Sequence, residues 1–219
     1  SDPVPDPQLT VFAEGGRELA RNTGWSTGPD AAAMVQLARN AGAFALSAGS
    51  ADSALVNSLG SGAYTLQITT PGGQGGLALA ELYELDGRGR TVNISTRAHV
   101  GSGDRTLIGG FVVAGTAYKR MLIRAVGPSL RSFGVTDALA DPVLTVYAGP
   151  TPLATNDRWS STNATMIAAA AIHVGAFNLA TNTEDAALLI TVPPGAYTAE
   201  LRGKADTTGV ALLEIYEVP

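Results

Sequence analysis

The side chains best suited to chemistry lie in the segment Asn156-Asp157-Arg158-Trp159. Asparagine and aspartate oxygens in a loop are ligands that Ca²⁺ accepts, and Asp185 is a further carboxylate that the fold could bring to them. An Asx turn between two strands, with Trp159 packed on a sheet, accounts for the same residues without a metal. Asn156, Asp157 and Asp185 are therefore candidate calcium ligands. The alternative is that these residues have a purely structural role.

The residues needed for catalysis are sparse. His99 and His173 are the only histidines, so a paired-histidine zinc site is ruled out. Ser129 is the nucleophile that a Ser-His-Asp site would need. Its surroundings, Gly127-Pro128-Ser129-Leu130, lack the Gly-x-Ser-x-Gly elbow of hydrolases and resemble a turn that ends a strand. We therefore expect no catalytic residues, no cofactor and no enzymatic activity.

Composition excludes several classes of partner. The 219 residues carry a net charge of −5 and form no basic stripe, which argues against nucleic acid. No apolar run approaches the length of a membrane span. Cysteine is absent, which excludes disulfides and thiol chemistry. Aromatic residues are only 6% of the chain, so a carbohydrate is a partner that the fold class allows but that no cluster of aromatics supports.

The chain contains one unit twice. Asp-Pro-Gln-Leu-Thr-Val-Phe from Asp6 corresponds to Asp-Pro-Val-Leu-Thr-Val-Tyr from Asp141, and the correspondence continues to the end of the chain. The period exceeds the roughly 20–50 residues of solenoid repeats and indicates a duplicated domain. Thr23 stands at the position of Asp157 while Asn22 and Trp25 are retained, which favours the turn over calcium. Other matched positions are Phe44 with Phe177, Asp52 with Asp185, and Glu81 with Glu214.

Apolar residues alternate with a period of two, which predicts strands. In the first copy the pattern covers residues 9–13, 64–69 and 77–84, and the second copy repeats it. Residues 92–100, 107–114 and 120–126 add three strands that precede only the second copy. The second copy then has about eight strands, enough for a jelly roll, and the first about five. Residues 31–38 and 164–171 fit either a short helix or a strand entrance.

The predicted fold is all-β, with two related jelly-roll-like β-sandwich lobes. Residues 1–86 form an incomplete repeat with an N-terminal extension, and residues 87–219 form a complete one. The first copy lacks the front strands of the repeat. Arg124 lies in the apolar strand Met121 to Val126, where burial would require a partner, and we expect it on the solvent face with Arg97 and Arg120.

The second copy carries a string of motifs: Ile108-Gly109-Gly110-Phe111, Leu122 to Leu130 (LIRAVGPSL), and the Asp-Pro strand from Asp141. The Asp-Pro strand, with Leu153 to Trp159, Pro194 to Thr198 and Gly209 to Tyr216, resembles the pre-peptidase C-terminal type of bacterial β-sandwich. With the first two motifs ahead of it, the string resembles more closely a repeat of large secreted bacterial proteins. The resemblance covers residues 91–219 fully and residues 6–86 for the back half alone. It implies a secreted, non-catalytic accessory module.

A missing front half leaves an open sheet edge, which aggregates unless a partner completes it. We therefore expect an extracellular or cell-surface structural subunit that binds copies of itself head-to-tail through strand complementation. The proline-rich segment Ser1 to Pro7 indicates a processed N-terminus and is a candidate for the inserted arm. Two other readings stay open: the middle strands serve both lobes, or the missing half lies upstream in a longer repeat array. The alternative function is an accessory module that binds carbohydrate, protein or calcium.

Overall fold

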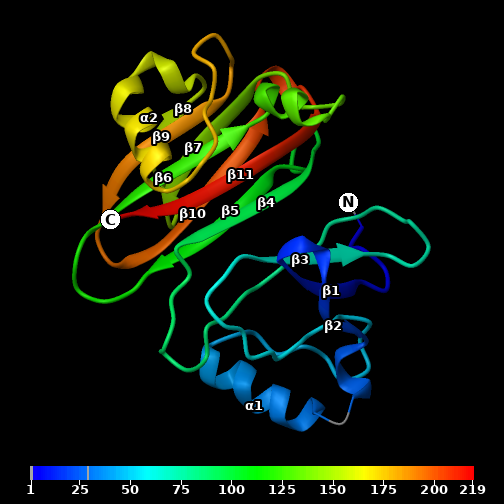
Figure 1. The fold of residues 1–219 in the computed structure, drawn as a ribbon. Helices are drawn as coiled ribbons and strands as arrows, with labels where there is room; N and C mark the ends of the chain where they lie inside the picture. Colours follow the sequence, from blue (N-terminus) through cyan, green and yellow to red (C-terminus); the bar gives the residue numbers. More distant parts are fainter. Residues whose placement is uncertain (1, 29) are drawn as a thin grey trace. The chain divides into compact units, whose positions relative to one another are not determined.

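The structure, a computed structural model, describes residues 2–28 and 30–219. The chain divides into two compact units, Ser1–Arg90 (unit 1) and Thr91–Pro219 (unit 2). Three antiparallel sheets make up most of the regular structure of the described residues, with two α-helices beside them (Figure 1). The prediction of an all-β fold is therefore confirmed.

Unit 2 is a sandwich of two four-stranded sheets, ordered β5-β10-β7-β8 and β4-β11-β6-β9. When its eight strands are counted in chain order, the sheets run 2-7-4-5 and 1-8-3-6, which is the order of a jelly roll. The three strands predicted ahead of the second copy are present as β4 to β6. The strands are β4 (Asn93–Val100), β5 (Leu107–Val113), β6 (Lys119–Val126), β7 (Pro142–Ala148), β8 (Thr151–Asn156), β9 (Ala186–Val192), β10 (Gly195–Gly203) and β11 (Gly209–Val218).

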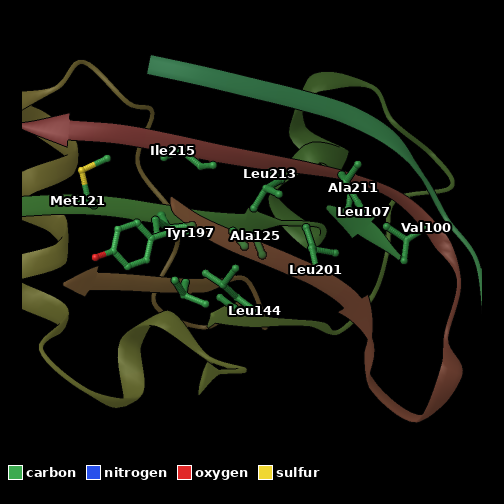
Figure 2. Close-up of a cluster of buried hydrophobic side chains, with 14 of the residues drawn as sticks. Val100, Leu107, Met121, Ala125, Leu144, Tyr197, Leu201, Ala211, Leu213 and Ile215 are labelled. Carbon is green, nitrogen blue, oxygen red and sulfur yellow. The ribbon is translucent and has the colours of Figure 1, made fainter. Parts of the chain in front are cut away.

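The core of unit 2 lies between its two sheets, as Figure 2 shows. Strand side chains alternate between the faces of a sheet, so every second residue of β6 and β11 points inward. The inward residues of these strands are Met121, Ile123 and Ala125, and Ala211, Leu213 and Ile215. Leu144 on β7 and Tyr197 and Leu201 on β10 meet them from the facing sheet.

The outer face of the β4-β11-β6-β9 sheet is also covered. Helix α2 (Ala164–His173) packs there through Ile167, Ala170 and Ala171, against Leu122 of β6 and Ala187 of β9. Of the two readings offered for this segment, helix is the one observed. The helix follows Asn163, but the Asn163 side chain makes no capping hydrogen bond. The short helix η3 (Pro128–Phe133) follows β6 directly.

Unit 1 contains one three-stranded sheet in the order β2-β1-β3. Its elements are β1 (Gln8–Ala13), β2 (Glu18–Thr23), α1 (Ala31–Ala41) and β3 (Tyr64–Thr69). By the duplication this sheet corresponds to β8-β7-β10, without a counterpart of β5. Among the described residues of unit 1, only Thr10, Val11 and Trp25 are buried. All three clusters of buried apolar residues belong to unit 2.

The prediction of a strand at residues 77–84 is wrong. Leu77 makes a single bridge with Pro3, and residues 78–85 form no strand in the described structure. The corresponding strand of unit 2, β11, pairs with β4 on one side and β6 on the other. Unit 1 lacks counterparts of both, so a segment with strand sequence has no neighbour to bond with. Unit 1 therefore has three strands among its described residues, not the predicted five.

Candidate assembly site

Strand β6 carries an arginine into the covered outer layer of unit 2. Arg124 is 0% exposed and lies opposite Glu214 in the β6–β11 ladder. Its Nε donates a hydrogen bond of 2.7 Å to Glu214 Oε2, and its Nη2 lies 2.6 Å from the same oxygen, without the alignment of a hydrogen bond. The expectation that Arg124 faces solvent is therefore wrong. The alternation was correct, but the outer face is covered at this point.

Two aromatic residues complete the surroundings of the arginine. The guanidinium carbon lies 4.4 Å from the ring centroid of Phe177, a cation–π contact, and Nη1 donates a 2.6 Å hydrogen bond to the Phe177 carbonyl. The Tyr216 hydroxyl donates a 2.7 Å hydrogen bond to Glu214 Oε1. Burial and the adjacent Glu214 carboxylate raise the pKa of Tyr216, so its hydroxyl stays protonated and remains a donor. Both oxygens of Glu214 are thereby satisfied in a layer that excludes water.

The turn after β6 is held by a second buried carboxylate. Asp185 accepts hydrogen bonds from the Gly127 amide at 2.9 Å, the Ser129 amide at 3.3 Å and the Ser129 hydroxyl at 2.5 Å. Gly127 is required at this turn because a Cβ there would lie 2.2 Å from the Leu139 carbonyl oxygen. Strand β6 and its Gly-Pro-Ser turn are thus held by three side chains of the back half: Phe177, Asp185 and Glu214.

Unit 1 retains all three of these residue types without the strand that they bind. Phe44, Asp52 and Glu81 correspond to Phe177, Asp185 and Glu214, and we call these three the acceptor residues. In unit 1 each is exposed; Phe44 is 56% exposed. The Asp52 carboxylate accepts from the Ser50 hydroxyl, and Glu81 accepts from the Tyr83 hydroxyl at 3.0 Å. The Tyr83–Glu81 bond repeats the Tyr216–Glu214 bond, but no arginine lies beside Glu81 among the described residues.

The apolar residues around the acceptor residues are exposed as well. Leu82 is 53% exposed, whereas its counterpart Ile215 is 4% exposed in the core of unit 2. Leu79 is 71% exposed, although the corresponding Leu212 packs against a buried cluster. Exposed side chains of this kind continue through unit 1 at Val56, Leu59, Leu66, Leu77 and Leu85. Unit 1 thus exposes apolar side chains at positions that are packed in unit 2.

The candidate calcium ligands are all engaged within the chain. The Asn156 Oδ1 accepts from the Arg158 amide at 3.1 Å, which is the expected Asx turn, and from the Ala187 amide at 3.0 Å. Asp157 accepts a 2.8 Å hydrogen bond from Lys204 Nζ, which lowers the pKa of Asp157. Asp185 is the buried carboxylate described above. Within residues 2–28 and 30–219, no cluster of His, Cys, Asp or Glu is suited to hold a metal.

Both copies share the hydrogen bond that joins this asparagine to an alanine amide and the buried tryptophan that follows. Asn22 Oδ1 accepts from the Ala54 amide at 3.1 Å, as Asn156 does from Ala187. Trp25 and Trp159 are both buried, and each indole donates to a backbone carbonyl, Ser47 and Ala180 respectively. The retained asparagine and tryptophan therefore serve the local fold.

The structure does not bring the residues considered for catalysis into one group. Ser129 bonds Asp185. His99 is exposed on β4, and His173 is exposed at the last residue of α2. As expected, Arg97 and Arg120 are exposed. None of the helices in the described part of the chain is long and apolar enough to cross a membrane.

Comparison with solved structures finds a similar β domain. It is the pre-peptidase C-terminal domain of collagenase from Bacillus anthracis, with a TM-score of 0.35 and 13% sequence identity. The match covers 57% of this chain and 89% of that chain. No family model matches the chain, and no curated protein matches it.

Sequence reasoning missed the role of Arg124 with its partners Phe177 and Glu214, and the role of Asp185 in the turn after β6. The signal that would have found them is the duplication itself. Glu81 and Glu214 are charged residues at the same place in two otherwise apolar strands, and Asp52 and Asp185 are likewise matched. A charge that recurs inside an apolar pattern indicates a buried partner of opposite charge.

Proposed function

We propose that this protein is an extracellular structural subunit that assembles through β-strand complementation into a filament or surface layer. One observation carries the proposal. Residues 77–85 have the sequence of a central sandwich strand, yet residues 78–85 form no ladder, and the segment exposes leucines whose counterparts are packed in unit 2. A sheet with unsatisfied edges and an uncovered apolar face binds a partner or aggregates.

The chemistry of the surface favours strand addition over a flat protein contact. Strand β3 offers an edge where β10 has its β5 neighbour. Residues 78–85 offer unpaired backbone donors and acceptors on both sides. Main-chain hydrogen bonds then provide affinity, and pockets for alternate side chains provide specificity. The open edge of β3 and residues 78–85, which together form the acceptor surface, lie in unit 1 only. Contact between subunits is therefore head-to-tail and does not close on itself.

The N-terminal arm is partly used within its own unit. Val4 donates a 2.8 Å hydrogen bond to the Leu77 carbonyl, and the Leu77 amide donates to Asp2 at 3.1 Å. This contact involves the first residue of the 77–85 segment and leaves the rest of it open. Residues 2–4 therefore hold the first residue of the 77–85 segment. Strand complementation does not require residues 2–4 as the inserted strand.

The test is electron microscopy of the native material together with light scattering of the purified chain. Ordered filaments or sheets, with a particle mass that grows with concentration, are the expected result. A monomer that stays compact at high concentration would overturn the proposal. The same sample would then be screened for carbohydrate and calcium binding, the tests of an accessory module.

A further inference from the structure

We infer that the strand that completes unit 1 carries an arginine against Glu81 and a Gly-Pro-Ser turn against Asp52. The inference rests on the proposed function and names what its acceptor site recognises. In unit 2, residues 119–130 occupy this place, as β6 and the turn after it. The occupant of unit 1 is therefore a segment of the same sequence type.

The first step of the argument is geometric. In unit 2, β6 pairs antiparallel with β11 from Leu212↔Val126 to Val218↔Arg120, and with β9 from Lys119↔Val192 to Ala125↔Ala186. It lies between those two strands in the sheet. The counterparts in unit 1, residues 53–59 and 77–85, form no ladder with each other in the described structure. A single strand placed between them would restore both ladders at once.

The second step is electrostatic. A carboxylate in a covered layer requires a partner of opposite charge or a full set of hydrogen-bond donors, and Glu214 has Arg124 as its cation. When a strand covers residues 77–85, Glu81 becomes such a carboxylate, because its counterpart Glu214 is 4% exposed. Tyr83 donates to one of its oxygens and leaves the other for a cation. An arginine at the position of Arg124 would satisfy Glu81 and stack on Phe44, as Arg124 does on Phe177.

The third step concerns the turn. In unit 2 the Asp185 carboxylate accepts hydrogen bonds from Gly127 and Ser129. Both donors belong to residues 119–130 and not to the back half of the repeat. Asp52 retains the backbone role of Asp185, since the Trp25 amide donates to its carbonyl at 2.7 Å as Trp159 does to Asp185 at 2.8 Å. Its carboxylate is exposed and bonds only the neighbouring Ser50 among the described residues. It is therefore available for a Gly-Pro-Ser turn.

Within residues 1–219, one segment of this type is present, and unit 2 uses it. A copy that donated residues 119–130 would open its own unit 2. The occupant is therefore a further segment of the sequence type of residues 119–130.

The test uses the full chain and a fluorescein-labelled peptide of residues 116–131, with binding measured by fluorescence anisotropy. Because Phe44, Asp52 and Glu81 are exposed, their substitution leaves the fold intact and isolates the recognition step. Glu81→Gln in the protein, or Arg124→Met in the peptide, is expected to weaken binding at least about thirty-fold, the loss typical of breaking one desolvated charge pair. Combined, the two changes should cost little more than either one.

Glu14→Gln is the matched control, because Glu14 is an exposed glutamate of unit 1 outside residues 53–59 and 77–85. It removes the same charge and should leave affinity unchanged. Asp52→Asn and Phe44→Ala should each weaken binding as well. A peptide that does not bind, or that binds Glu81→Gln and Glu14→Gln equally, overturns the inference.

Failure of the inference and failure of the proposed function are separable. Filaments formed by a chain that ignores the peptide would support assembly and assign a different strand to unit 1. A chain that binds the peptide through Glu81 but remains monomeric would support the recognition and overturn assembly. Hydrogen exchange of β9 and β11 in the assembly tests the source. Loss of protection there would mean that copies exchange residues 119–130, which overturns the assignment to a further segment.

Discussion

Arg124 and Glu214 face each other across the β6–β11 ladder, and their side chains form a buried ion pair with Nε and Oε2 2.7 Å apart. The two residues are 90 positions apart in the sequence, and both are buried. The pair joins the front half of the repeat to its back half. Its glutamate has a counterpart in unit 1, Glu81, and its arginine has none.

Removal of one member of this pair should destabilise unit 2 strongly. Arg124→Met leaves the Glu214 carboxylate buried without a partner, and we expect a loss of about 3–5 kcal/mol in the free energy of unfolding. Chemical denaturation measures it. Arg120→Met, at an exposed position on the same face of β6, is the control, with an expected change within about 0.5 kcal/mol. The double variant Arg124→Met/Glu214→Leu should recover most of the loss. A cost under about 1 kcal/mol for Arg124→Met would contradict this account.

The matched aspartates should differ in the same way. Asp185→Ala leaves the Gly127 and Ser129 amides without their acceptor in a buried turn, at a cost of about 1–3 kcal/mol for each amide. Asp52→Ala removes an exposed carboxylate and should change stability by less than about 0.5 kcal/mol. Thermal unfolding of the two variants gives the comparison. Equal losses would mean that Asp52 already holds a turn in the isolated chain.

Acid should weaken one surface interaction of unit 2. The hydrogen bond from Lys204 lowers the pKa of Asp157, and the same bond, with the nearby Asp141, raises the pKa of Lys204. A lowered folded-state pKa adds stability that is present above the unfolded value of 3.8 and is lost as pH falls through the folded value. The raised lysine pKa adds stability below 10.5 that is lost as pH rises through the folded value.

Asp157→Asn should therefore lower the melting temperature slightly at pH 7, and the difference from the wild type should vanish in strong acid. The effect is small because both side chains are about half exposed and water screens the pair. Melting curves from pH 2 to pH 8 at low and high salt provide the measurement. A difference that persists at pH 2 would show that the substitution acts through something other than charge.

A pair of substitutions at corresponding positions of the two units tests whether Leu82 is exposed in the dissolved chain. Ile215→Ala empties a buried site and should cost about 2–5 kcal/mol. Leu82→Ala, at the corresponding position of unit 1, should cost less than about 0.5 kcal/mol in the dissolved chain. Leu82→Asp should leave the monomer folded and abolish the growth of particle mass with concentration. If Leu82→Ala destabilised the dissolved chain as Ile215→Ala does, Leu82 would already be covered there.

The local patterns along the chain determined much of this architecture. The strands predicted at residues 92–100, 107–114 and 120–126 correspond to β4, β5 and β6, because alternation of side chains between two faces is a property of each strand by itself. The repeated Asp-Pro, Asn-x-x-Trp and Gly-Ala-Tyr-Thr strings showed the duplication. The same comparison showed that residues 91–139 have no counterpart within residues 1–90. These inferences needed only short stretches of sequence.

Two features of the structure depend on residues that are far away in the sequence. Residues 77–84 carry the alternation of β11, yet they form no ladder, because a strand exists only where other strands satisfy its backbone. Arg124 sits on the outward side of β6, as the alternation predicted, but it is buried because α2 and the segment around Phe177 cover that side. Strand propensity describes the structure that a segment can adopt when a neighbouring strand is there to pair with it. Only the tertiary structure determines whether the partner is present and which face remains in water.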